Sequence, residues 1–182
     1  MVIKKGNYRI VIVIGSLVIK LPRVRLKSAI QCLIFEIKHG LISKYYSNAI
    51  LYAPSSKTNL FGGIISNWQE YQFYHQTKLP ILMPTYFSFF GLFNIQKRGK
   101  LLDVNRKDLF QQLYDLTNGE VFDDSHAFAN PANFCLQNGK LVMIDYSKKS
   151  RNVLIKYGEK IQQEFNLSYS WEEEYKKLKE AE

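Results

Sequence analysis

Cysteine is scarce in this chain, since only Cys32 and Cys135 occur among 182 residues. Both lie inside apolar runs, which is typical of buried thiols. Two cysteines cannot supply a disulfide scaffold, and neither is grouped with histidines at the spacing of a zinc site. A fold that depends on disulfides or on structural zinc is therefore excluded, and a hydrophobic core must stabilise the chain.

Long hydrophobic runs are also lacking. No uncharged apolar stretch reaches the ~18 residues of a membrane-spanning helix, and residues 80–95 are interrupted by Pro84 and Gly91. The N-terminal apolar run is broken by Tyr8 and Arg9 and has no small-residue cleavage site, so it predicts a β-strand and not a signal peptide. We therefore expect a cytoplasmic protein.

Acidic residues are few. The chain carries 16 Asp and Glu against 25 Lys and Arg, a formal net charge of +9. This excess suits acidic partners such as nucleotide phosphates, nucleic acid or an anionic membrane surface. The basic residues occur in short groups such as Lys97-Arg98 and Lys148-Lys149, which also fits a diffuse solvated surface. No specific nucleic-acid-binding motif stands out.

The first half of the sequence predicts a hairpin followed by two helices. Residues 7–14 and 17–21 are rich in β-branched residues and flank a two-residue turn. Residues 24–39 carry apolar residues at helical spacing, and residues 53–63 are expected to form a loop. The second helix is expected from about Asn67 to Thr77, with Asn67 as its N-cap and Glu70 completing a capping box.

The second half predicts strands, then a helix, a tight hairpin and a helical tail. Residues 81–97 favour strands, and the aromatic run at 86–90 is expected in the core. A helix is expected at residues 106–118. Asn138-Gly139 is the strongest hairpin signal in the chain, because both turn residues must accept positive φ. The tail at residues 151–182 is expected to be helical and charged.

Four polar residues follow one another in an order that suits phosphoryl transfer. Lys20 ends an apolar strand, Glu70 lies on a later helix, Asn133 falls in an irregular loop and Asp145 follows a tight hairpin. A strand lysine can contact phosphates, and a helix glutamate can hold that lysine by an ion pair. Asparagine and aspartate supply oxygen ligands for Mg²⁺.

In these segments the chain resembles the protein-kinase-like superfamily. LVIK at residues 17–20 resembles the strand V-A-I-K, and IDYS at residues 144–147 stands where that family carries D-F-G. HAFANPAN at residues 126–133 resembles the loop H-R-D-L-K-P-E-N, with matches at His126, Pro131 and Asn133. The resemblance implies that Lys20 and Glu70 bind the nucleotide, and that Asn133 and Asp145 hold Mg²⁺ and ATP.

The chain departs from the family at the catalytic aspartate. In the gapless alignment that position is Phe128, which cannot accept a proton. Divergent bacterial and phage kinases often carry D-x-H-x-x-N, and Asp124 matches this pattern if residues 127–130 form a short insertion that bulges out, with Phe128 pointing away from the site into apolar packing. Asp124 is then the implied base, Asp123 is a second candidate, and the absence of any base is the third alternative. A Gly-rich phosphate loop is missing, and Ser147 replaces the family's final glycine.

The resemblance implies an α+β fold of two lobes within a single domain, residues 1–182. A small antiparallel-sheet lobe would span about residues 1–98, and a reduced, mainly helical lobe about residues 99–182. Only 37 residues follow Asp145, which favours a compact acceptor, either an envelope sugar or one specific protein. Compact bacterial kinases of lipopolysaccharide core sugars are similar, and they imply an anionic lipid acceptor and peripheral contact with the inner face of the membrane.

Two functions of different classes follow from these observations. The first is an ATP- and Mg²⁺-dependent phosphotransferase with Asp124 and Lys20 as catalytic residues. The second is a pseudokinase, or a phage-type or effector-type module that binds a host protein, which Phe128 and the missing Gly-rich loop favour.

Overall fold

The computed structural model describes residues 1–47, 51, 54–146 and 149–180. The fold is α+β, as predicted, with two antiparallel sheets and several helices. The chain forms two compact units. The first comprises Met1–Gln76 and Pro84–Arg98, and the second comprises Thr77–Met83 and Gly99–Glu182.

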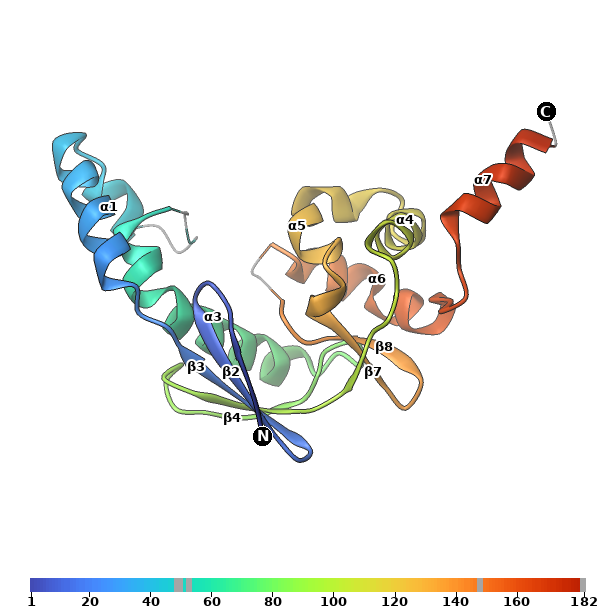
Figure 1. Cartoon of the computed structure of the whole chain (residues 1–182), viewed down its shortest axis with the longest axis horizontal. Helices are drawn as coiled ribbons and strands as arrows, with labels where there is room; N and C mark the ends of the chain where they lie inside the picture. The colour runs from blue at the N-terminus through green and yellow to red at the C-terminus, as the bar shows by residue number, and fades with distance from the viewer. Residues whose placement is uncertain (48–50, 52–53, 147–148, 181–182) are drawn as a thin grey trace. The chain divides into compact units, whose positions relative to one another are not determined.

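A five-stranded antiparallel sheet forms the base of the first unit (Figure 1). The predicted hairpin is confirmed, with a turn at Gly15 that has a φ of 55°. The N-terminal stretch forms two strands instead of one, because the chain turns at Gly6, whose amide donates to Arg9 O. The strands, in the sheet order β1-β2-β3-β5-β4, are β1 Val2–Lys5, β2 Arg9–Ile14, β3 Leu17–Pro22, β5 Asn94–Lys97 and β4 Thr85–Ser88.

Three helices complete the first unit: α1 Leu26–Lys38, α2 Ile42–Ser47 and α3 Ser56–Thr77. Helix α1 is confirmed within two residues, but the loop predicted at residues 53–63 is wrong because α3 begins at Ser56. Ser55 caps α3, since its hydroxyl accepts a hydrogen bond from the Thr58 amide at 3.1 Å. The buried Glu36 carboxylate accepts from the Ser56 amide at 2.7 Å and from the Ser56 hydroxyl.

Helix α3 lies across one face of the sheet (Figure 1) and approaches it closely at Gly63. A Cβ atom at this position would lie 2.3 Å from the Tyr8 carbonyl oxygen and 2.7 Å from Pro22 Cα. Gly91 is equally constrained, because its φ is 79° and a Cβ there would meet the Ile64 carbonyl at 2.2 Å. These two glycines set the distance between α3 and the strands beneath it.

The aromatic run at residues 86–90 forms strand β4 and the turn after it, but it is not part of the core. Tyr86, Phe87, Phe89 and Phe90 are all exposed, with Phe90 at 71%. The expectation of a core strand is therefore wrong. The reason is topological, since β4 is an edge strand of the sheet.

The second unit combines helices with a small sheet. The Asn138-Gly139 hairpin is confirmed, with φ values of 52° and 76°. The helix predicted from residue 106 and the helical tail are present as well. The elements are β6 Lys100–Leu101, α4 Arg106–Leu116, α5 Ser125–Phe128, β7 Phe134–Gln137, β8 Lys140–Met143, α6 Arg151–Glu164 and α7 Trp171–Glu180, with the 3-10 turns Glu120–Asp124 and Pro131–Asn133.

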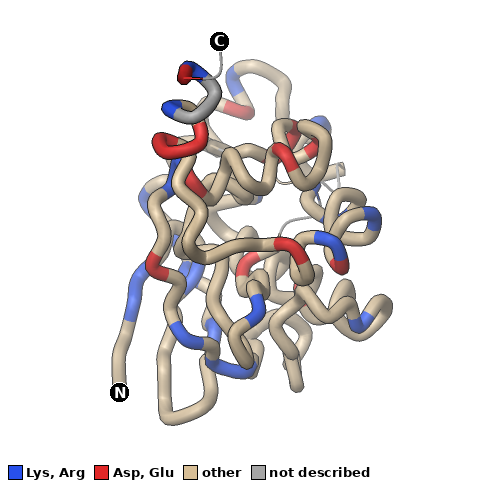
Figure 2. Tube along the Cα trace, turned by 90° about the vertical axis from the view of Figure 1, so that its right-hand side faces the viewer, with Lys and Arg blue, Asp and Glu red and all other residues tan. Residues whose placement is uncertain are grey.

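The two units differ in charge, and Figure 2 shows where the charged residues lie along the chain. The first unit carries 12 Lys and Arg against two acidic residues, a formal net charge of +10, whereas the second carries 13 against 14, a net charge of −1. The two acidic residues of the first unit are Glu36 and Glu70, and both are buried. No described helix has both the length and the apolar character that crossing a bilayer would need.

Candidate functional site

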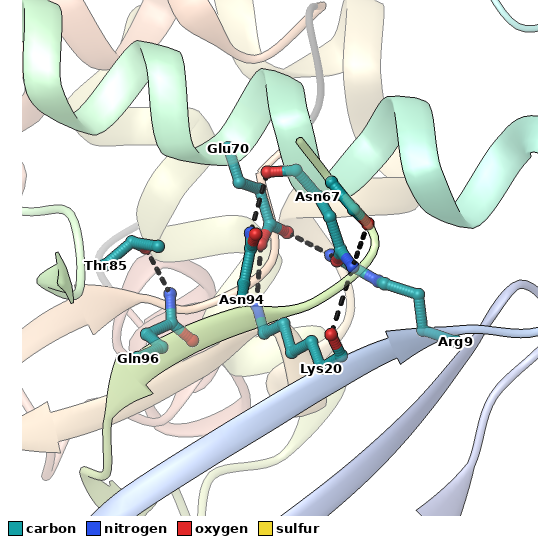
Figure 3. A network of polar contacts seen from close by, with 8 residues as sticks. Arg9, Lys20, Asn67, Glu70, Thr85, Asn94 and Gln96 are labelled. Atoms are coloured by element: carbon teal, nitrogen blue, oxygen red, sulfur yellow. Dashed lines mark hydrogen bonds and ion pairs between the residues drawn. The ribbon is translucent and has the colours of Figure 1, made fainter. Parts of the chain in front are cut away.

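The ion pair predicted between Lys20 and Glu70 is present in the first unit (Figure 3). Lys20 Nζ donates to Glu70 Oε2 at 2.8 Å, and the two residues are 4% and 1% exposed. Lys20 comes from β3 and Glu70 from the middle of α3. The pair therefore joins the central part of the sheet to the helix that covers it.

Arg9 is a second cation on the same carboxylate, and the sequence motifs did not identify it. Its guanidinium lies 2.5 Å from Glu70 Oε1, so that each oxygen of Glu70 contacts one cation. The signal was present in the strand pattern. Val11 pairs directly with Lys20 in the β2–β3 hairpin, and Arg9 shares the face of Val11 because side chains alternate along a strand.

Asn67 fixes α3 to the sheet, and its predicted role as an N-cap is wrong. It is fully buried inside the helix, where its side-chain amide donates to the carbonyls of Lys20 at 3.1 Å and Gly91 at 3.0 Å. The Asn94 side chain in turn donates to the Asn67 carbonyl at 2.7 Å. Asn67 lies one helical turn before Glu70 and on the same side, so these bonds hold Glu70 above Lys20 (Figure 3).

Asn94 carries a buried polar atom without a hydrogen-bond partner among the described residues. Its Oδ1 atom is buried and accepts nothing there. Asn94 lies directly opposite Lys20 in the pairing of β3 with β5, so this acceptor is on the residue that faces the lysine across the two strands. Burying an acceptor without a donor costs about 1–3 kcal/mol, which makes this position a candidate for a bound water or ligand donor.

In the second unit the structure brings Asn133 and Asp145 together. Asn133 precedes β7 and Asp145 follows β8, and the hairpin between them places both at one end of the small sheet. The Asn133 carbonyl accepts from the Ile144 amide at 2.8 Å and the Asp145 amide at 3.4 Å. Asn133 Nδ2 donates to Ala127 O at 2.9 Å, which leaves its Oδ1 atom on the other side of the amide.

Phe128 lies in the core of the second unit. It is completely buried, and its ring centroid is 6.4 Å from that of Phe134. The expected apolar packing of Phe128 is confirmed, and Ala127 and Ala129 are buried beside it around helix α5. Three consecutive small or apolar residues favour packing over exposure. Phe128 is therefore part of the hydrophobic core.

Asp124 is half-buried and is held by a hydrogen bond from the start of α6. The Ser150 hydroxyl donates to Asp124 Oδ2 at 2.5 Å. Asp123, the second candidate base, is exposed, and so is His126. Ser147 lies outside the described residues, so the structure does not describe the position that corresponds to the family's final glycine.

An open groove of about 610 Å³ lies beside the residues that follow Asp124 in the chain. Its walls come from the start of α4 and from α5. Three of its residues have basic side chains, Arg106, Lys107 and His126, and two are aromatic, Phe110 and Phe122. This composition suits a ligand with an anionic group next to a flat or apolar part. No motif or spacing in the sequence pointed to this groove.

The described carboxylates, histidines and cysteines form no cluster of three or more that could hold a metal ion. Asp145 is the only carboxylate of the predicted metal pair, and Asn133 contributes an amide oxygen. At the start of α6, burial lowers the pKa of the Arg151 guanidinium from its ordinary value, and Tyr146 opposes that change. A cation bound by Asn133 and Asp145 would take its further ligands from water or a bound molecule.

Replacing Glu70 with glutamine tests whether its carboxylate stabilises the first unit. Glu70→Gln removes the partner that Arg9 and Lys20 share, and breaking a buried ion pair costs about 3–5 kcal/mol. We expect a lower urea midpoint of unfolding. Glu120→Gln is the control, because Glu120 forms an exposed pair with Lys156 and the glutamine oxygen can still accept from the Tyr157 hydroxyl, so the midpoint should change little. Equal midpoints for the two variants would contradict a structural role for Glu70.

Comparison with known proteins yields no relative. No family model, no curated protein and no solved structure matches the chain. The geometry of two residue pairs, Lys20 with Glu70 and Asn133 with Asp145, is therefore the basis for assigning a function.

Proposed function

We propose that this protein is an ATP- and Mg²⁺-dependent phosphotransferase of the protein-kinase-like superfamily, with a small sheet-based lobe and a mainly helical lobe. One observation carries the proposal, the buried pair between the strand lysine Lys20 and the helix glutamate Glu70 at 2.8 Å. In that superfamily such a pair positions the lysine on the nucleotide phosphates, and its formation is a condition for activity.

The energetics of the pair support a functional role. Removing two charges from water is expensive, and a buried ion pair is often no more stabilising than apolar residues of the same volume. Apolar residues surround this position along β2 and β3, so a hydrophobic contact would have been a simple alternative. An ammonium group fixed on the sheet is useful where an anion such as a phosphate must be bound.

Asn133 and Asp145 fit a magnesium site that the nucleotide completes. Mg²⁺ in phosphate-transfer sites is commonly bound by one or two carboxylates together with substrate phosphates and water. The Asn133 amide is oriented by Ala127 O, so that its oxygen faces away from that carbonyl. When bound, the metal would neutralise charge on the phosphates, while Asn133 and Asp145 would fix its position.

Asp124 is the residue we assign as general base. Its hydrogen bond from Ser150 fixes one oxygen, which orients the carboxylate as a positioned base requires. The groove beyond Ser125 and His126 is lined by Arg106 and Lys107, so it suits an acceptor with anionic groups, such as an envelope lipid sugar. The alternative acceptor is a specific protein.

A pseudokinase is the second candidate, and the position of Phe128 favours it. In the gapless alignment this buried phenylalanine replaces the catalytic aspartate, and the Asp124–Ser150 hydrogen bond would then serve only to anchor α6. In that case the chain would bind a nucleotide or a host protein without turnover.

Nucleotide binding is tested by the thermal stability of the full chain with and without Mg·ATP. A ligand that binds only the folded state stabilises it by ~2.7 kcal/mol at a hundredfold excess over its dissociation constant. Asp145→Ala should remove most of that shift, because the metal loses its carboxylate. Asp123→Ala, at an exposed aspartate, should keep it. If Mg·ATP does not stabilise the parent, or stabilises Asp145→Ala equally, the assigned site is wrong.

Turnover is tested by Asp124→Asn. We expect phosphotransfer or ATP hydrolysis to fall roughly 10²–10⁴-fold while nucleotide affinity is kept, as for loss of a positioned base. Ser150→Ala serves as the control, because it removes the hydrogen bond to Asp124 but leaves the carboxylate, and its activity should fall less. Parent protein that binds Mg·ATP without any turnover would establish the pseudokinase.

A further inference from the structure

Helix α1 presents an apolar stripe to solvent. Leu26, Ile30, Ile34 and Ile37 are 64%, 56%, 51% and 60% exposed. Their spacing of four, four and three residues places them along one side of the helix. Isolated exposed apolar residues are ordinary on protein surfaces, but four aligned on one helix form a continuous patch of the kind that marks an interaction site.

The side of α1 next to this stripe is attached to α3, which fixes the direction of the stripe. Ala29 and Glu36 are buried, and Glu36 binds the first residue of α3 through the Ser56 amide and hydroxyl. Cys32 Sγ lies 3.6 Å from the Asn59 side-chain nitrogen. The helix cannot rotate its apolar stripe inward without breaking these buried hydrogen bonds.

Lysines border the stripe. Lys27 is three residues before Ile30, and Lys38 is four residues after Ile34, so both lie next to the apolar side chains along the helix surface. Both are exposed. The only acidic residue of α1, Glu36, is buried against the start of α3. The exposed part of the helix thus combines apolar and cationic side chains without a carboxylate.

The rest of the first unit is also cationic on its exposed surface, like the exposed part of α1. Its two acidic residues are buried and engaged, Glu36 with Ser56 and Glu70 with Lys20 and Arg9. The exposed charges of this unit are therefore cationic. A surface of this kind is complementary to an extended anionic surface and repels another copy of itself.

We propose that α1 docks this protein on an anionic phospholipid bilayer, lying in the plane of the membrane interface. The four apolar side chains would enter the boundary between headgroups and acyl chains, while Lys27 and Lys38 would contact the anionic headgroups. A like-charged second copy is disfavoured as the occupant, and a neutral apolar partner would leave the lysines without a role. This inference does not depend on nucleotide binding.

Vesicle co-sedimentation of the full chain tests the proposal. Neutral phosphatidylcholine vesicles are compared with vesicles that contain one quarter phosphatidylglycerol. We expect the partition coefficient to be at least about tenfold higher on the anionic vesicles. Raising the salt to about 0.5 M should remove most of this difference, because it screens the lysines.

Two variants of α1 separate the apolar and the charged contributions. Ile30→Ser with Ile34→Ser, and Lys27→Glu with Lys38→Glu, should each reduce partition by about tenfold or more. The matched controls lie in the second unit: Leu101→Ser with Ile155→Ser at exposed apolar positions, and Lys100→Glu with Lys140→Glu at exposed lysines. They should stay within about twofold of the parent, because binding in the membrane interface depends on the apolar and cationic side chains of α1.

Three results would overturn the proposal. The first is equal partition of the parent on neutral and anionic vesicles, and an absence of binding to both kinds of vesicle counts as the same result. The second is loss of binding in the control variants as large as in the α1 variants. The third is a lipid-free dimer, seen by light scattering, that becomes monomeric in the Ile30→Ser, Ile34→Ser variant, because α1 would then be covered by a second copy.

Discussion

The buried carboxylate of Glu70 is the constraint on which the first unit depends. It accepts from Lys20 at 2.8 Å and from Arg9 at 2.5 Å, and therefore ties β2, β3 and α3 together. Such a carboxylate is stable in the interior only while its cations are in place. The Asn67 hydrogen bonds and the close approach at Gly63 hold the helix at the distance that this requires.

Local patterns were sufficient for the hairpins and for most helices. Alternation predicted the β2–β3 hairpin, and Asn138-Gly139 predicted the β7–β8 turn, because these signals act between neighbours in the chain. The start of α3 was missed because its cap includes Glu36, a residue from another helix. Asn67 was misassigned for a related reason, since its hydrogen-bond partners lie on distant strands and only the folded chain brings them near.

The candidate site was predictable to a similar degree. Residue type and order were enough to predict the Lys20–Glu70 pair, but Arg9 required the strand register, which places it on the face of Lys20. The apolar packing of Phe128 was also predicted, from the alignment that makes Asp124 the base. Burial of three consecutive small or apolar residues is favourable, and it makes this segment part of the core of the second unit. Charge adds a constraint that motifs do not contain, because the first unit is cationic on its exposed surface.

The central claim is that Lys20, held by Glu70, binds nucleotide phosphate. Calorimetric titration of Mg·ATP into the full chain and into Lys20→Met tests it most directly, since methionine keeps much of the side-chain volume and lacks the ammonium group. We predict one bound nucleotide per parent chain and an affinity at least about tenfold weaker in the variant, as expected for a lost charge-assisted contact. Circular dichroism would establish that the variant is folded. Equal affinities, or no binding by the parent, would contradict the claim.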